Sequence, residues 1–239
     1  MKTLLTTILS FSFLICIGQD MTGSELLDKT ISFHDSNGKW SSLAAKVTFE
    51  PEERDGKTIN RFIEFKDGGN YFRYYKNDGE IEIDESVNSG ECTISLNGKT
   101  DISDEDKEKY RLTCDRVKWI RDYYVYLYGL PMKLKDKGTN IDEKVTEAQF
   151  MGVNYLKLRV TYEAEVGKDI WYFYINPETY EMTAYQFFHD ENKGDGEYIT
   201  LEGTVEIDGI KIPKKRTWIT NKEDKLLGVD DIAKIEKLN

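Results

Sequence analysis

The sequence has few of the residues on which most enzyme active sites depend. It contains two histidines and three cysteines in 239 residues. Two histidines cannot supply a three-histidine zinc site. The chain also lacks a G-x-S-x-G nucleophile elbow, a phosphate-binding loop, an H-E-x-x-H motif and a C-x-x-C motif. We therefore expect no bound metal and no cofactor, and the sequence favours a non-enzymatic protein over a catalyst.

The chain also lacks an excess of positive charge. Lysine and arginine total 33 against 44 aspartates and glutamates, which gives a net charge of -11. The acidic residues are spread along the chain and do not form a tail. Because binding to phosphates requires a basic surface, we expect no nucleic-acid partner. An acidic excess of this kind is sufficiently explained by solubility.

Long apolar runs are absent except at the start of the chain. Lys2 precedes an apolar segment, residues 4–17, which small and polar residues follow. This segment is short for a transmembrane helix, which needs about 20 apolar residues, and its pattern is that of a secretory signal peptide. The sequence thus predicts a signal peptide over 1–18, cleaved near Gly18. The mature chain, 19–239, is then exported to the periplasm or the extracellular space and does not span a membrane.

The cysteines divide between the signal peptide and the mature chain. Cys16 is preceded by Ile15, whereas a lipoprotein signal places a small residue there, so lipid attachment is the less favoured alternative. Cys92 and Cys114 remain after cleavage. In an oxidising compartment such a pair is typical of a disulfide, and two free buried thiols are the alternative.

Most of the chain after residue 42 alternates apolar and polar residues with a period of two. This alternation is typical of half-buried strands, and Asp-Gly and Asn-Gly turn signals separate the segments. We expect about eleven strands in one antiparallel arrangement. The segments that carry the pattern are 43–49, 58–66, 70–76, 80–84, 92–96, 144–150, 153–163, 170–175, 180–189, 196–207, 210–220 and 225–237.

Two segments, 24–34 and 110–128, instead place apolar residues at spacings of three and four, which predicts helices. Ser24 is a candidate N-cap for the first, while Gly129 and Pro131 end the second. Strands and helices do not alternate along the chain. The sequence therefore predicts a mainly β, α+β fold, in which two or three helices cover one side of a large curved sheet that forms a part-barrel.

Both histidines occur in the tripeptide Phe-His-Asp, as His34-Asp35 and His189-Asp190. One hypothesis is that the two pairs, with Glu191, form a metal or acid-base centre, which would require the first helix and a distant turn to meet in space. The simpler interpretation is that both pairs belong to turns at the ends of a helix and a strand.

Aromatic residues suggest a cavity. The strand 170–175 has large apolar side chains on both faces, so either both faces are buried or one lines a cavity. Arg61 and Arg73 are in phase with the apolar residues of their strands, and arginines at a cavity mouth could hold an anionic head group. The alternatives are ordinary core packing and pairing of the arginines with acidic residues. The aromatic residues that we expect to line the cavity are Trp119, Tyr123, Trp171, Phe173 and Trp218.

Four stretches, 129–134, 161–175, 185–191 and 196–203, resemble an uncharacterised family of exported Bacteroidota proteins. The order of strands and helices also resembles the half-barrel of the lipoprotein carriers LolA and LolB. That resemblance implies a single LolA-like domain that binds a lipid, an acyl chain or another hydrophobic ligand in the concavity of its sheet. The alternatives are a metal-dependent or acid-base enzyme that uses the two His-Asp pairs, and a module that binds another cell-envelope protein.

Overall fold

The computed structural model describes residues 21–238, so the predicted signal peptide, residues 1–18, lies outside the described part of the chain. Fourteen strands form one antiparallel sheet within that part. They are β1 (Ala45–Phe49), β2 (Glu52–Arg54), β3 (Lys57–Lys66), β4 (Tyr71–Asn77), β5 (Glu82–Asn88), β6 (Glu91–Leu96), β7 (Thr139–Ile141), β8 (Thr146–Phe150), β9 (Val153–Tyr162), β10 (Ile170–Ile175), β11 (Met182–Phe188), β12 (Glu197–Ile207), β13 (Ile210–Thr220) and β14 (Leu226–Lys237).

The sheet is open and curved, in the order β6-β5-β4-β3-β1-β14-β13-β12-β11-β10-β9-β7, with β2 on β3 and β8 on β9. The C-terminal strand β14 pairs with both β1 and β13, and so joins the first six strands to the last eight. This arrangement confirms the predicted antiparallel α+β fold, although with more strands than expected. The strands β2 and β7 have only three residues each, too few to show an alternating pattern.

Helix α1 (Gly23–His34) begins one residue before the predicted segment 24–34. Its N-cap is Thr22, which accepts a hydrogen bond from the backbone of Glu25, while the Glu25 side chain accepts one from the backbone of Thr22. This reciprocal capping box makes Thr22 the N-cap of α1, in place of the predicted Ser24. Leu26, Leu27, Thr30 and His34 are the side chains that α1 buries.

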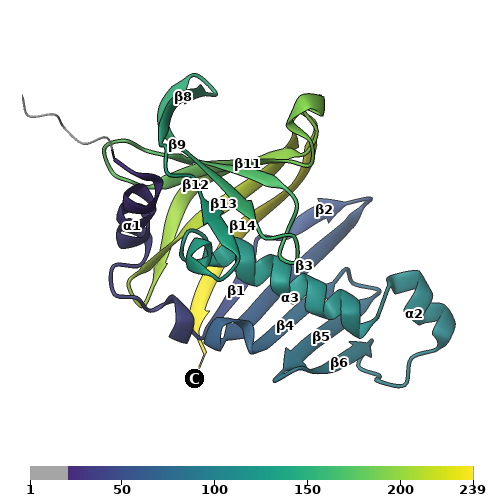
Figure 1. Ribbon diagram of the computed structural model, residues 1–239. Helices are drawn as coiled ribbons and strands as arrows, with labels where there is room; N and C mark the ends of the chain where they lie inside the picture. The colour runs from purple at the N-terminus through teal and green to yellow at the C-terminus, as the bar shows by residue number, and fades with distance from the viewer. Residues whose placement is uncertain (1–20, 239) are drawn as a thin grey trace, which may run out of the picture.

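Helix α3 (Cys114–Gly129) lies across the N-terminal strands on the concave side of the sheet, which we call the inner face (Figure 1). Thr113 caps its first turn. A side chain at Gly129 would place its Cβ 2.5 Å from the Trp40 ring, so only glycine fits at the end of this helix. The preceding helix α2 (Asp104–Tyr110) was not expected from the sequence, because it buries none of its residues and so has no apolar stripe.

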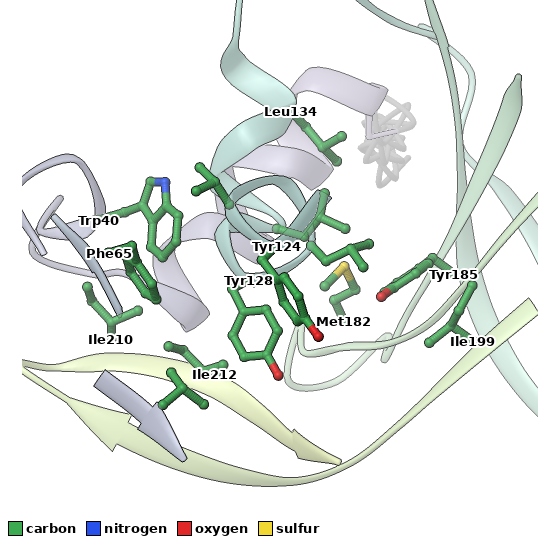
Figure 2. Packing of buried hydrophobic residues seen from close by; sticks show 14 of the residues in the cluster. Trp40, Phe65, Tyr124, Tyr128, Leu134, Met182, Tyr185, Ile199, Ile210 and Ile212 are labelled. Carbon is green, nitrogen blue, oxygen red and sulfur yellow. The ribbon is translucent and has the colours of Figure 1, made fainter. Parts of the chain in front are cut away.

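The core fills the space between α3 and the inner face (Figure 2). A disulfide between Cys92 and Cys114 joins β6 to the first residue of α3. Closing a loop of 22 residues stabilises the fold by about 3 kcal/mol in a chain-entropy model. Between residues 21 and 238, no helix combines the length and the apolar character that crossing a membrane requires.

Candidate ligand-binding site between the long helix and the sheet

Two clefts lie along α3. The larger, about 740 Å³, is the η2 cleft, named after the 3-10 helix η2 (Asp67–Gly69) at one side; Tyr126 of α3 and Trp171 of β10 also line it. The smaller, about 290 Å³, is the β14 cleft, which opens between α3 and the strands β2, β3, β12, β13 and β14. Its lining residues are Glu52, Arg54, Arg61, Tyr123, Tyr124, Glu197, Trp218, Leu227, Gly228, Val229 and Asp230.

Arg61 reaches the β14 cleft because it is in phase with the apolar residues of β3, so its side chain lies with theirs on the inner face. One of its terminal nitrogens lies 3.0 Å from Oδ1 of Asp230. The same nitrogen donates to the Tyr124 hydroxyl at 3.3 Å. Glu52, at the rim, is 3.6 Å from the other terminal nitrogen. Arg61 is therefore held by a buried carboxylate inside the cleft and a half-exposed one at its edge.

A second arginine lies behind this pair. Arg216 of β13 is directly opposite Asp230 of β14 in the strand register, and only 1 % of it is exposed. Its Nη1 donates to the Pro213 carbonyl at 3.1 Å, and its guanidinium lies 4.0 Å from the centre of the Tyr128 ring. Burial raises the pKa of Asp230, while Arg61 and Arg216 act against that shift.

Tyrosine hydroxyls complete the polar surroundings. Tyr128 of α3 and Tyr185 of β11 are buried on opposite sides of the space between helix and sheet; the hydroxyl of Tyr185 points toward α3, and that of Tyr128 points toward the strands (Figure 2). Burial raises the pKa of Tyr185 to about 12, and the pKa of Tyr128 is raised well above its ordinary value by the same cause. Both side chains therefore remain neutral and keep a proton to donate.

Four buried side-chain polar atoms between residues 21 and 238 have no hydrogen-bond partner. We call them the donor cluster, and they are Arg61 Nε, Arg216 Nε, the Tyr128 hydroxyl and the Tyr185 hydroxyl. Buried polar groups in folded proteins are nearly always paired, because an unpaired one costs about 1–3 kcal/mol. Arg61 lines the β14 cleft, and the other three residues lie in the core behind it, so this region is a candidate site.

The rim of the β14 cleft is apolar on two sides. Leu227 lines the cleft and is 44 % exposed. The ring of Tyr123 stacks on that of Trp119, with 5.4 Å between ring centroids, and Trp119 is 54 % exposed. The opening thus presents Leu227 and Trp119 to solvent beside the charged side chains of Glu52 and Arg54, while its inner end carries Arg61 and Asp230.

The aromatic residues predicted from the sequence occupy different places. Tyr123 and Trp218 line the β14 cleft, as does Arg61. Trp171 lines the η2 cleft, where it packs on Phe187. Phe173 is buried in the core and lines neither cleft. The contact of any of them with a ligand stays a prediction.

Arg73 lies away from Arg61, although the sequence suggested one shared site. Phe72 and Tyr74 of β4 both stack on Tyr124 of α3, so they occupy the inner face. Arg73, between them, points to the outer face, where Nη2 lies 2.7 Å from Asp84 Oδ2. The expectation that Arg73 is at the same cavity mouth as Arg61 therefore does not match the structure.

His34 and Asp35 have structural partners. His34 Nδ1 donates to the Lys211 carbonyl at 2.9 Å, and Nε2 accepts from the Met182 amide at 3.1 Å. Burial lowers the pKa of His34 to about 4, so the ring is neutral, as these two bonds require. The Asp35 carboxylate accepts from the backbone amides of Lys39 and Trp40, and so holds the turn after α1.

His189 and Asp190 belong to an exposed turn. His189 Nδ1 lies 2.7 Å from Asp169, and this hydrogen bond raises the pKa of His189. Asp190 accepts from the Asn192 amide. His34 binds the first residue of β11 and His189 follows its last, so the strand separates them by roughly 20 Å. The structure does not bring the two His-Asp pairs together, and residues 21–238 contain no group of three metal-ligating side chains.

Solved structures with the same fold cover nearly the whole chain. A LolA superfamily protein from Nitrosomonas europaea is 11 % identical, with a TM-score of 0.54, over 92 % of this chain and 94 % of that one. A DUF1329 family protein from Desulfovibrio piger is 11 % identical, with a TM-score of 0.50, over 91 % and 93 % of the two chains. At these identities the likeness shows a LolA-like fold. No protein with a curated description matches the sequence. A family model matches residues 2–237, and the chain belongs to that family, a family of unknown function, DUF6503.

Proposed function

We propose that this protein is an exported, non-enzymatic carrier or binding protein that holds a lipid, an acyl chain or a similar hydrophobic ligand between α3 and the inner face of the sheet. The observation that carries the proposal is the β14 cleft, in which the exposed Leu227 and the buried rings of Tyr124 and Trp218 lie beside a charged inner end. Burying a hydrocarbon chain stabilises a complex by about 0.8 kcal/mol per methylene, so such binding requires no catalytic group.

The fold supports the proposal without deciding it. The LolA-like half-barrel is a resemblance that implies a lipid or acyl ligand in the concavity, but one fold serves many functions. The disulfide between Cys92 and Cys114 agrees with a location in an oxidising compartment such as the periplasm. The predicted signal peptide leads to the same compartment.

The direct test is native mass spectrometry of the purified mature protein together with extraction of bound lipid. We expect a co-purified amphiphile or, if the protein is empty, saturable binding of a fluorescent fatty-acid probe. An empty protein that binds no probe would contradict the proposal.

Two neighbouring leucines provide a matched pair of variants. Leu227 lines the β14 cleft, whereas Leu226, 59 % exposed, does not. We expect Leu227→Glu to lower probe affinity about tenfold, because a charge at the rim opposes entry of a hydrocarbon chain. Leu226→Glu should leave the affinity nearly unchanged. Equal effects of the two variants would argue against entry through this cleft.

A further inference from the structure

The donor cluster has a common chemical character. A guanidinium Nε carries a hydrogen and only donates, and a tyrosine hydroxyl donates as readily as it accepts. Arg61 and Arg216 contribute one such nitrogen each, and Tyr128 and Tyr185 one hydroxyl each. One group that satisfies these atoms together must therefore be rich in acceptors, as a carboxylate or a phosphate is.

The lining of the β14 cleft carries both signs of charge, with Glu52, Glu197 and Asp230 beside Arg54 and Arg61, so it is the buried Arg216 behind this lining that favours an anionic ligand. Arg61 is paired with Asp230 and, at 3.6 Å, with Glu52. Arg216 has no carboxylate within ion-pair distance among the described residues. Its Nη1 donates to the Pro213 carbonyl, its guanidinium lies over the Tyr128 ring, and it is close enough to Tyr185 to oppose the rise in the pKa of that hydroxyl. Asp230, its cross-strand neighbour, acts on Arg216 only from beyond that distance and is paired with Arg61, and a buried cation without a close anionic partner is destabilising. A negative group beside Arg216 would remove that cost.

The donor cluster adjoins the β14 cleft. Trp218 follows Arg216 by two positions on the same face of β13 and lines the cleft. Asp230, the cross-strand partner of Arg216, lines it as well. A ligand that entered between Leu227 and α3 would therefore meet the two arginines at the inner end, with apolar surface behind it at the rim.

We propose that the β14 cleft binds an amphiphile whose acidic head group, a carboxylate or a phosphate, accepts hydrogen bonds from Arg216, Arg61, Tyr128 and Tyr185. The hydrocarbon chain of this ligand lies toward the rim formed by Trp119 and Leu227. This inference rests on the proposed function and specifies the ligand class and its orientation.

The test uses three ligands with the same chain: dodecanoate, dodecyl phosphate and dodecanol, titrated into the delipidated mature protein by calorimetry. We expect at least one acid to bind about tenfold or more tightly than dodecanol, and the tighter acid identifies the head group. Equal affinities for all three would overturn this inference and leave hydrophobic binding intact. No binding of any of them would overturn the proposed function as well.

Conservative variants test the assigned atoms. Tyr128→Phe removes an unpartnered hydroxyl, so the melting temperature should stay the same or rise, whereas Tyr185→Phe removes a hydroxyl that interacts with Arg216 and should change the melting temperature little. Each should reduce the preference for the acid about threefold to tenfold, with dodecanol affinity unchanged. Tyr75→Phe is the control, since its hydroxyl bonds Glu82 on another part of the sheet. Arg216→Met should abolish the preference, and if that variant does not fold, the two tyrosine variants decide. An unchanged preference in both tyrosine variants would overturn the assignment.

Discussion

His34 and Arg216 are equally hidden from solvent, at 2 % and 1 % exposure, yet their surroundings differ. Both ring nitrogens of His34 have backbone partners, the Lys211 carbonyl and the Met182 amide. Arg216 has an unpartnered Nε and no carboxylate in ion-pair range within the described chain. A buried polar side chain whose bonds are all made holds the fold together, whereas one with unused donors is available to a ligand.

The largest effect should come from His34→Ala. The substitution leaves the Lys211 carbonyl and the Met182 amide buried without partners, each at a cost of about 1–3 kcal/mol, so we expect a loss of about 4 kcal/mol in the free energy of unfolding. Urea denaturation measures this loss. The control, His189→Ala, should cost less than about 1 kcal/mol, because its pair with Asp169 is exposed. Comparable losses in both variants would mean that the backbone bonds of His34 do not stabilise the fold.

A second expectation concerns pH. The pKa of His34 is lowered to about 4 by burial, with smaller contributions from the charges of Arg216 and Lys211. The unfolded chain takes up this proton near pH 6.5 and the folded one only near 4. The neutral ring therefore contributes stability above pH 6.5 that is lost as the pH falls toward 4. The loss amounts to about 3 kcal/mol at 1.36 kcal/mol per pKa unit.

In the wild-type protein, Glu85 contributes a pH dependence of opposite sign, which offsets part of the loss of stability on acidification that His34 causes. Burial raises its pKa to about 7, so its contribution is complete below the unfolded value of 4.5 and is lost as the pH rises through 7. Glu85→Gln removes the opposing group, and unfolding by urea between pH 7 and 4 should then show a steeper loss on acidification than wild type. Adding His34→Gln to that background should flatten the curve. If the Glu85→Gln protein and the protein with both substitutions lost the same stability between pH 7 and 4, the loss on acidification would not come from His34.

Local patterns explain why the sheet was predictable. The segments 170–175 and 210–220 coincide with β10 and β13, because alternation within one strand is visible in the sequence. Helix α2 was missed because a helix without buried residues has no stripe. The strands β2 and β7 are shorter than one clear repeat.

The site was only partly predictable, because a period of two does not say which face is the inner one. Arg61 and Arg73 are equally in phase with apolar neighbours, and only the packing of β4 against α3 separates them. Arg216 and Asp230 were missed although both follow the alternation of their strands. Their pairing depends on the register of β13 and β14, which no single segment contains. Tyr128 and Tyr185 likewise meet the arginines only after helix and sheet pack.

The smallest expected effect tests whether Arg61 and Arg216 are shared between Asp230 and a ligand. Asp230→Asn keeps the shape of the side chain and removes a buried negative charge that would repel an acidic head group. We expect dodecanoate to bind about tenfold more tightly and dodecanol to be unaffected, when measured by calorimetry well below the melting temperature. Glu52→Gln is the matched control at the rim, where solvent screens the charge, so its effect should be smaller. If Asp230→Asn leaves dodecanoate affinity unchanged, the head group does not lie beside this carboxylate, and Arg216 would then resemble His34 as a residue that serves the fold alone.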